Sequence, residues 1–306
     1  MKKLLLILLC LPMMTLAQQT YVPDDNFENY LETHDLNGDS IALGSPTSMG
    51  DGIANNDYVT TASINTVIHL DLSNTEIYDL TGIEDFTALT YLNCYNNLLT
   101  SLDLSANSHM TELDCQDNSL TSINVSNNTS LTFFACSFNL LTSLDVSQNI
   151  ALITLDCDAN QLTGLDVSNN TALIELDCFY NQLTSLDVSN NTSLISLLCY
   201  ENEFTSLDVR NGNNINFLNW GFNCKWNTNL SCINVDNVAW STTNWTDIDP
   251  QHYFSNNCPP SSIQEYSLNK ELLKATDLLG RETKQTNQPL FYIYDDGTVE
   301  KRIVVE

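Results

Sequence analysis

The sequence predicts a mostly β solenoid, a fold in which successive coils of the chain stack in register. Three observations predict it: a period of about 21 residues, apolar and asparagine positions that stay fixed within each period, and short runs that alternate like a β-strand. Each period opens on a large apolar residue, at Leu89, Met110, Leu131, Leu152, Leu173, Leu194 and Ile215. Because one coil cannot bury its own apolar row, we expect stability to come from contacts between neighbouring coils.

Each coil follows the template L-x-x-L-x-C-x-x-N-x-L-T-S-L-D-V-S-x-N, and residues 68–88 fit it with one extra residue. Fixed leucine and asparagine positions at this period are typical of leucine-rich repeats. In residues 174–179 the alternation turns Leu176 and Cys178 inward, which predicts one short strand of a parallel sheet per coil, with strands about 4.8 Å apart. Residues 186–188 predict a second, shorter strand on the opposite side of the coil. The β-branched and turn-forming residues around it argue against helix.

Two inward columns are expected to hold the coils together. Inward asparagines can satisfy backbone groups left unpaired where each strand turns away; they are Asn97, Asn118, Asn139, Asn160, Asn181, Asn202 and Asn223. The second column comprises Cys94, Cys115, Cys136, Cys157, Cys178 and Cys199, with Leu72 before it and Trp220 after it. The apolar flanks predict buried thiols that act as small hydrophobes. A disulfide between coils is compatible with their spacing although parallel side chains do not converge, and a straight column does not supply a tetrahedral metal site.

Two segments precede the repeats. Residues 1–17 have a basic start, an apolar run and a small residue at Ala17, which predicts a signal peptide. Residues 18–66 are expected to form a cap, in which a short helix over VPDDNFENYLETH covers the open edge of the first coil. The run Asp35-x-Asn37-x-Asp39 opens like a calcium loop, but its position 12 is Pro46 rather than Glu, which excludes an EF-hand. A looser calcium site and an ordinary polar turn remain as alternatives, and we expect no other cofactor.

The repeats are expected over residues 67–222 and a C-terminal cap over residues 223–258. An exported chain can use disulfides, and a Cys232–Cys258 pair would staple this cap and leave Cys224 odd, although sequence alone does not derive the pairing. Residues 259–306 are expected to be a separate domain, because they hold six of the ten Lys and Arg residues. Within them, residues 290–294 and 298–305 are expected to pair as a hairpin through Asp295-Asp296-Gly297.

The blocks LTxLDCxxNxLTSLDVSxNT resemble the leucine-rich repeat proteins exported by Bacteroidetes-type bacteria, over roughly residues 21–258. The tail resembles the C-terminal sorting domain of the type IX secretion system, through a D-x-x-G-R motif and a closing hairpin, although the upstream Pro-Asn-Pro motif of that family is absent. The matching positions are Asp277, Gly280, Arg281, Tyr292, Gly297 and Lys301. This resemblance implies that the type IX secretion machinery is a partner, and that the protein is secreted or held on the outer cell surface after removal of the tail. The alternative is a small β cap with solvated basic residues.

The outward side chains of the predicted sheet are the candidate ligand-binding residues, because solenoids of this type usually bind through their ordered sheet. They mix aromatic rings with carboxylates, and comprise Tyr91, Tyr95, Glu112, Phe133, Asp156, Asp158, Glu175, Asp177, Phe179 and Tyr200. The next coil is expected to continue these columns with Phe217, Asn219 and Gly221. Exposed aromatic residues favour a contact surface, although their high β propensity is an alternative reason for their presence.

A column of aspartates is expected on the opposite side of the coils, at Asp103, Asp145, Asp166, Asp187 and Asp208, with Asn124 interrupting it. Carboxylates stacked about 4.8 Å apart repel one another. Either bound cations or hydrogen bonds from serine and asparagine would relieve this repulsion.

Composition and motifs exclude several functions. Ten Lys and Arg against 38 Asp and Glu give a formal charge of −28, which excludes nonspecific nucleic-acid binding as a main role and disfavours anionic membranes. No run after the signal peptide approaches the ~18 apolar residues of a membrane helix, so no transmembrane anchor is expected. The four histidines are scattered away from Cys and Asp at motif spacing, and no G-x-S-x-G, H-E-x-x-H or phosphate loop occurs, so no catalytic residue and no enzyme activity are predicted.

These observations predict a secreted or cell-surface scaffold for protein recognition or adhesion. The alternative is capture of surface carbohydrate, with Tyr95, Phe179 and Tyr200 as stacking platforms.

Overall fold

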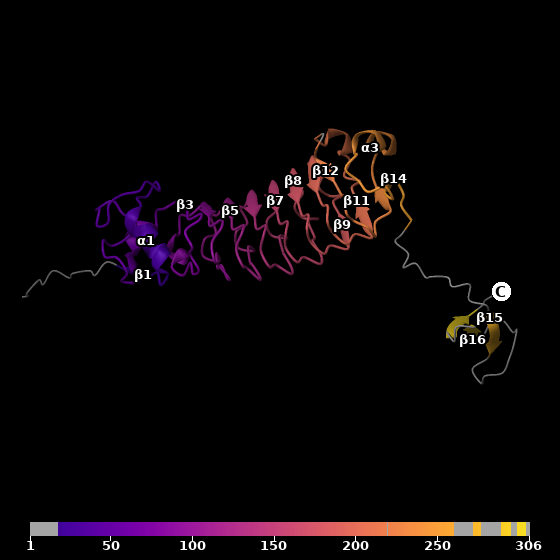
Figure 1. The fold of residues 1–306 in the computed structure, drawn as a ribbon, viewed down its shortest axis with the longest axis horizontal. Helices are drawn as coiled ribbons and strands as arrows, with labels where there is room; N and C mark the ends of the chain where they lie inside the picture. The colour runs from indigo at the N-terminus through magenta and orange to yellow at the C-terminus, as the bar shows by residue number, and fades with distance from the viewer. Residues whose placement is uncertain (1–17, 219, 260–271, 277–288, 295–298, 304–306) are drawn as a thin grey trace, which may run out of the picture. The chain divides into compact units, whose positions relative to one another are not determined.

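The computed structural model describes residues 18–218, 220–259, 272–276, 289–294 and 299–303. The chain divides into two units, Met1–Cys258 and Pro259–Glu306. In the first unit the coils stack as a solenoid between α1 (Asp25–Thr33) and α3 (Val238–Asn244), as Figure 1 shows. The predicted signal peptide, residues 1–17, lies outside the described residues.

Eight parallel strands form the main sheet, in the order β12-β10-β8-β7-β6-β5-β4-β3. Their bounds are β3 His69–Asp71, β4 Tyr91–Asn93, β5 Glu112–Asp114, β6 Phe133–Ala135, β7 Thr154–Asp156, β8 Glu175–Asp177, β10 Ser196–Leu198 and β12 Phe222–Asn223. The register follows the period, since Leu176 pairs with Leu155 on one side and with Leu197 on the other. The predicted parallel sheet of short strands is confirmed.

The second strand of the coil is present in the C-terminal part of the solenoid. A parallel sheet in the order β14-β13-β11-β9 comprises β9 (Ser185–Asp187), β11 (Ser206–Asp208), β13 (Cys232–Asn234) and β14 (Tyr253–Ser255). In the earlier coils this side is extended, and an isolated parallel bridge joins Asp103 to Asn124. The prediction of a second strand in every coil is therefore wrong for the first coils, where the chain follows the same path without ladder pairing.

The predicted asparagine column bonds the backbone between coils. The Asn139 amide donates to the carbonyl oxygens of Cys115 (3.0 Å) and Cys136 (3.1 Å), and its Oδ1 accepts from the backbone N–H of Leu120 (2.9 Å). A second column of fully buried asparagines, which sequence reasoning left unassigned, also donates to backbone carbonyl oxygens, although its side-chain oxygens have no hydrogen-bond partner; it comprises Asn107, Asn128, Asn149, Asn170 and Asn191. Because one amide replaces several missing backbone partners, each coil turns without leaving those groups unpaired.

The last coil of the main sheet departs from the period. Phe222, and not Leu218, pairs with Leu197, so the continuation predicted from the regular period is wrong from residue 215 onward. The extra residues form η2 (Asn214–Asn216), which leaves Ile215 58% exposed, while Phe217 is buried as the opening residue of the coil. Cys224 is consequently the seventh buried thiol of the column, whereas Trp220, predicted there, is 61% exposed.

Asn227 similarly replaces the predicted Asn223 in the amide column, since its Nδ2 donates to the carbonyl oxygens of Cys199 and Cys224. Gly221 precedes the Phe222–Asn223 strand instead of following it, and Asn219 lies outside the described residues. Parallel pairing continues past residue 222, the expected end of the repeats, through β13 and β14 and a bridge between Asn223 and Asp247.

The N-terminal cap contains the predicted helix. Asp24 caps α1 by accepting from the backbone N–H groups of Asn26 and Phe27, and Phe27 and Leu31 are fully buried against the first coil. The cap also contains α2 (Thr61–Ile64) and an antiparallel pair of β1 (Gln19–Tyr21) and β2 (Tyr58–Thr60), and η1 (Ile83–Asp85) follows in the first coil. The helix thus covers the apolar edge that a terminal coil would otherwise expose.

The C-terminal cap holds a disulfide between Cys232 and Cys258, with Cα atoms 5.7 Å apart, as the sequence predicted. In the second unit, β15 (Leu272–Thr276), β16 (Pro289–Tyr294) and β17 (Val299–Ile303) form an antiparallel sheet. The predicted hairpin is confirmed by the β16–β17 pairing. Among the described residues, no helix has the length and apolarity that a bilayer crossing requires.

Candidate binding face

The outward side chains of the main sheet form three columns, which we call the sheet face. The first column comprises His69, Tyr91, Glu112, Phe133, Thr154, Glu175 and Ser196. The second comprises Asp71, Asn93, Asp114, Ala135, Asp156, Asp177, Leu198 and Asn223. The third follows two residues further along each coil, at Tyr95, Gln116, Ser137, Asp158, Phe179, Tyr200 and Lys225. All the residues predicted for binding occupy these columns, and their role in binding stays a prediction.

Carboxylates gather around β7 and β8. Asp156 and Asp177 are paired neighbours in the second column, and Asp158 lies beside them in the third; we call these three residues the acidic block. Burial, and then the charge of Asp158, raises the pKa of Asp156 to about 6. Burial, and then the charge of Asp156, raises the pKa of Asp177 to about 7. The acidic block therefore retains protons near neutral pH that an ordinary surface aspartate releases.

Asp158 is the most enclosed member of the acidic block. The residue is only 6% exposed, its Oδ1 accepts a hydrogen bond from the hydroxyl of Ser137, and its Oδ2 is buried with no hydrogen-bond partner. Burial also raises the pKa of this carboxyl group. A buried carboxylate oxygen without a donor is uncommon in folded proteins and marks a place where a donor is missing.

Aromatic rings continue the third column beyond the acidic block. The rings of Phe179 and Tyr200 stack with centroids 4.3 Å apart and planes 9° from parallel. Trp226 meets the edge of Tyr200 at 5.8 Å and 71°. A second stack, between His69 and Tyr91, lies at the other end of the sheet face with a centroid distance of 4.0 Å. The predicted stacking platforms Phe179 and Tyr200 therefore form one continuous surface, whereas Tyr95 lies several coils away.

Three further exposed aromatic residues flank the third column, and sequence reasoning missed them. Phe138, Tyr180 and Trp226 are 57–58% exposed and have positive φ angles of 53°, 56° and 58°. The other coils also have a left-handed residue at this position: Asn74, Asn96 and Asp117, which tolerate it well, and then Ala159 and Glu201. A bulky ring is less favourable there by roughly 1 kcal/mol. These rings are thus exposed at positions where local conformation favours a small polar residue.

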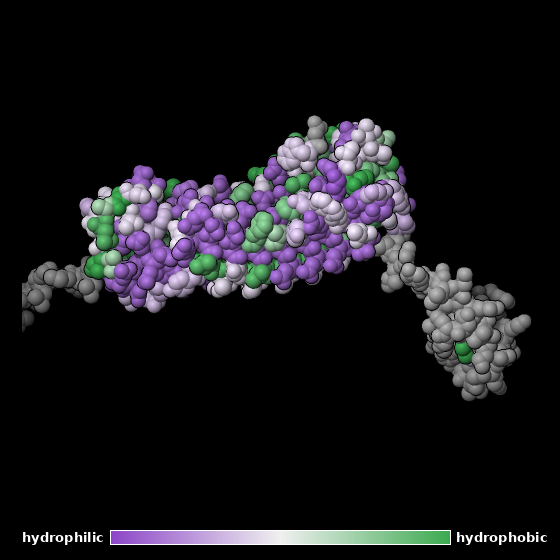
Figure 2. All heavy atoms as spheres, viewed as in Figure 1, coloured by the Kyte–Doolittle hydropathy of each residue, from purple (hydrophilic) through white to green (hydrophobic). Residues whose placement is uncertain are grey.

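Positive charge is scarce near the acidic block. In the part of the first unit that the structure describes, the basic side chains are Arg210 and Lys225. Arg210 pairs with Asp208, and Lys225 Nζ lies 2.7 Å from a carboxylate oxygen of Asp247. Figure 2 shows hydrophilic residues over most of the visible face of this unit, with hydrophobic residues in separate patches. In the described part of the first unit, neither Arg210 nor Lys225 forms an ion pair with the acidic block.

The aspartate column on the opposite side is relieved by hydrogen bonds. Each member accepts from the backbone N–H two residues further along: Asp145 from Ser147 at 2.9 Å and Asp166 from Ser168 at 2.9 Å, for example. Hydrogen bonds from the side chain and backbone of Ser147 lower the pKa of Asp145. The serine alternative of the sequence prediction thus accounts for this column, and a role for cations there stays a prediction.

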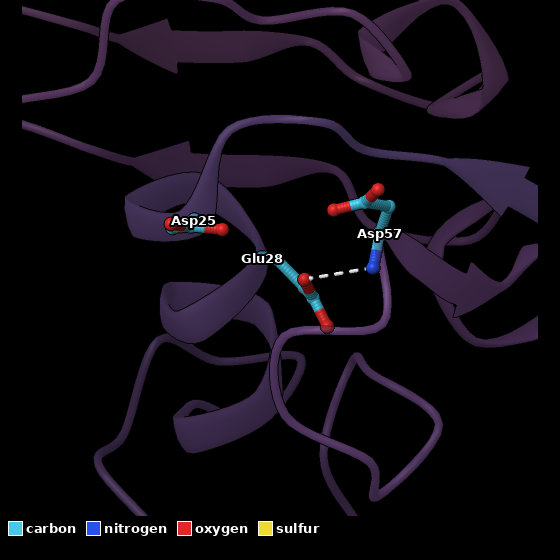
Figure 3. A group of neighbouring side chains, drawn as sticks. All are labelled: Asp25, Glu28 and Asp57. Atoms are coloured by element: carbon cyan, nitrogen blue, oxygen red, sulfur yellow. Dashed lines mark hydrogen bonds between the residues drawn. The ribbon is translucent and has the colours of Figure 1, made fainter.

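Three carboxylates of the N-terminal cap approach one another closely enough to hold a metal ion. One carboxylate oxygen from each of Asp25, Glu28 and Asp57 lies within 4.8 Å of the others (Figure 3), and sequence reasoning missed this group. Buried Glu28, however, already accepts from the backbone N–H groups of Asn56 (3.0 Å) and Asp57 (3.1 Å). These bonds tie the loop before β2 to α1, which is a sufficient structural reason for the cluster.

The predicted calcium motif has the contacts of a polar turn. One carboxylate oxygen of Asp35 accepts from the backbone N–H of Asn37 (2.9 Å) and of Asp39 (3.1 Å). These bonds lower the pKa of Asp35. The contacts support the turn alternative, and calcium binding at Asp35, Asn37 and Asp39 stays a prediction.

A cysteine, a histidine and an aspartate meet in the C-terminal cap, although the sequence showed no histidine with a Cys or Asp at motif spacing. The sulfur of Cys224 lies 3.7 Å from Nδ1 of His252, whose Nε2 is 3.5 Å from Asp249. The backbone N–H of Asp249 donates to Nδ1 at 3.1 Å, and burial raises the pKa of the Cys224 thiol. A nucleophile requires a thiolate that the substrate can reach. This buried, protonated thiol therefore serves the packing of the cap.

Two of the predicted sorting residues fall on described strands. Tyr292 lies on β16 opposite Glu300, and Lys301 lies on β17 opposite Phe291. The other predicted sorting residues lie outside the described residues; they are Asp277, Gly280, Arg281 and Gly297.

Solved structures similar to this chain are leucine-rich repeat proteins. The functional domain of InlJ from Listeria monocytogenes, described as including a cysteine ladder, shares 32% identity with a TM-score of 0.51, over 72% of this chain and 52% of that domain. The fold is a leucine-rich repeat solenoid. The leucine-rich repeat protein LIC12759 from Leptospira interrogans shares 20% identity over 63% of this chain and 50% of its own, with a TM-score of 0.47. Internalin C2 from Listeria monocytogenes shares 19% identity over 72% of this chain and 98% of its own, with a TM-score of 0.45.

The chain spans about half the length of the InlJ domain and of the Leptospira protein. No protein-family model matches this sequence, and neither does any curated protein. The buried thiol column of this solenoid is similar in kind to the ladder described for InlJ, and here it runs from Cys94 to Cys224.

Proposed function

We propose that this protein is a secreted or cell-surface scaffold that recognises another protein through the sheet face, and that it has no enzymatic activity. The single observation that carries the proposal is the Phe179–Tyr200 stack beside the acidic block, a half-buried aromatic surface bordered by charge. Aromatic residues are enriched at the centres of protein interfaces, because they bury large area at little conformational cost. The similarity to internalin-like structures supports a binding role for the solenoid.

The exposed rings at left-handed positions add support. Phe138, Tyr180 and Trp226 each occupy a conformation that disfavours them, and each ring is mostly exposed. Packing within the chain therefore covers only part of each ring, as in the contact of Trp226 with Tyr200. Contact with a partner would give a reason for bulky rings at these positions.

The proposed route is export followed by sorting. The basic and apolar start of the chain supports a signal peptide, and the resemblance of the tail to type IX sorting domains supports recognition by that secretion machinery, then removal of the tail. Fractionation of the source cells, with mass spectrometry of the mature termini, tests this route. We expect a mature protein that begins near Gln18 and lacks the tail, residues 259–306. Intact termini in the cytoplasm would overturn it.

Binding is tested by capture on the immobilised protein from host and bacterial surface proteins, alongside a glycan array. The double variant Phe179→Ala/Tyr200→Ala should lose the captured protein and still fold. Tyr21→Ala/Tyr58→Ala is the matched control, because those two rings form another exposed pair, 5.5 Å apart, on the N-terminal cap. Equal loss in both variants would refute recognition through the sheet face.

Carbohydrate capture is the second candidate, favoured by the same parallel aromatic stack, on which a sugar ring could lie. A positive glycan array together with no captured protein would replace the first proposal by this one.

A further inference from the structure

The acidic block and its aromatic neighbour form a compact unit of the sheet face. Asp156 and Asp177 are direct neighbours across the β7–β8 pair, and Asp158 and Phe179 follow them by two residues on the same two coils. Three carboxyl groups and one ring therefore occupy the corners of a rectangle, with about 4.8 Å between coils and about 6.6 Å along each coil. Tyr200 extends the ring side by stacking on Phe179.

The carboxylates of this unit lack the hydrogen bonds that others in the same column make. Side-chain oxygens of the second column elsewhere accept from the backbone N–H two residues further along: in Asp71, Asn93, Asp114 and Asn223 these distances are 2.9–3.1 Å. Among the described residues, no donor bonds the side chain of Asp156 or Asp177 in this way, and Oδ2 of Asp158 is buried without a partner. The carboxyl groups of this unit therefore have few hydrogen-bond donors and no neighbouring positive charge within the described part of the first unit.

The geometry of the carboxylates distinguishes between kinds of cation. A metal ion needs ligand oxygens that converge on one point. In the described residues, the carboxylates that come within 4.8 Å of one another as a group of three are those of Asp25, Glu28 and Asp57, not those of the acidic block. A guanidinium group is planar, carries five N–H donors in a fork, and stacks on aromatic rings, so it can reach separated carboxylates and a ring together.

We propose that the acidic block, with the Phe179–Tyr200 stack, is a binding site for an arginine side chain presented by a segment of the protein partner. The guanidinium donates to the partly exposed carboxyl groups of Asp156 and Asp177 and lies against the aromatic stack, next to buried Asp158. This inference rests on the proposed function, since it names the chemistry that the sheet face recognises. Charge-assisted, forked hydrogen bonds of this kind give geometric specificity as well as affinity.

The test uses fluorescence anisotropy of the full-length protein with a labelled Gly-Arg-Gly-Arg-Gly peptide at about 0.15 M salt, which screens long-range attraction. The double variant Asp156→Asn/Asp177→Asn should weaken binding by about tenfold or more. The matched control Asp145→Asn/Asp166→Asn also replaces two aspartates by asparagine, on the opposite side of the coils, and should change binding by less than about twofold. The same peptide with citrulline in place of arginine should bind weakly to every variant.

Three results would overturn the site: equal weakening by the two double variants, unchanged binding of the citrulline peptide, or a lysine peptide that binds as tightly as the arginine peptide. The proposed function fails separately. Suppose that capture of a protein requires Phe179 and Tyr200 but is unchanged in Asp156→Asn/Asp177→Asn. That result would refute the arginine site, and it would still support recognition through the sheet face. If the arginine peptide binds specifically but no protein is captured, the arginine site is supported and the proposed function is refuted.

Discussion

Replacement of Asp177 by asparagine probes the electrostatics of the sheet face through protein stability. Burial, followed by the charges of Asp156 and Asp158, raises the pKa of Asp177 from 3.8 to about 7. Asparagine keeps the shape of the side chain and carries no charge at any pH. A neutral residue is compatible with this column, because Ala135 and Leu198 occupy it in other coils.

The sign of the effect follows from proton binding. The unfolded chain releases the proton of Asp177 near pH 3.8, whereas the folded protein keeps it up to about pH 7. The folded state therefore binds more protons between these values, and the free energy of unfolding falls as the pH rises through them. A shift of about 3 units corresponds to about 4 kcal/mol, which we halve to about 2 kcal/mol because the group is only half-buried. Asp177→Asn should raise the free energy of unfolding by about 2 kcal/mol at about pH 8, and by much less at about pH 4.

Urea denaturation followed by intrinsic fluorescence, at about pH 4, 6 and 8, measures this difference. Asp145→Asn is the matched control on the opposite side of the coil. There the bonds from Ser147 lower the pKa of Asp145, so the charge stabilises the folded state above the ordinary pKa and the variant should gain nothing at high pH. Equal stabilisation by both variants would show that net charge, not the environment of Asp177, is responsible, and would refute the reasoning.

Asn139→Ala leaves the buried N–H of Leu120 unpaired and removes one of the two asparagine donors to each of the carbonyl oxygens of Cys115 and Cys136, so it should cost about 1–3 kcal/mol in urea denaturation; unchanged stability would contradict the amide column. Cys178→Ser should destabilise more than Cys178→Ala in the same assay, because burying a hydroxyl costs more than a small cavity; the reverse order would argue for a polar role of the thiol. Cys232→Ser/Cys258→Ser opens a loop with a sequence separation of 26 and should cost about 3 kcal/mol, measured by thermal melting without reductant. Tyr180→Asn should stabilise the protein by roughly 1 kcal/mol while weakening partner capture; lost stability would show that the left-handed ring packs.

The period of the sequence predicted the fold well as far as residue 214. Alternation in a template such as that around Leu176 and Cys178 determines which side chains are buried, because a one-residue slip would turn the whole row outward. The last coil was mispredicted because Ile215 and Phe217 are both apolar and two residues apart. Only packing decides between them, and the larger ring fills the interior against Phe222 and Trp245.

The sequence predicted which residues lie together in the candidate site, but not their hydrogen bonds. Alternation placed Asp156, Asp177 and Phe179 on one face, and adjacency in the template made them neighbours. The missing donor at Asp158 depends on the rotamer of one side chain against Ser137, which no sequence pattern specifies. The meeting of Cys224 with His252 likewise brings together residues 28 apart through an irregular cap. The repeat period carries no information about a contact of this kind.

The asparagine columns have a consequence for how such a chain can change its length. Every amide bonds the coil that precedes it in the same manner, so excising or duplicating one whole period would rejoin identical bonding partners at the new junction. Tandem duplication within the gene could therefore lengthen the molecule in whole steps of about 4.8 Å without inventing a new interior. Outward residues would then be free to diverge from copy to copy, while the scaffold beneath them stays constant.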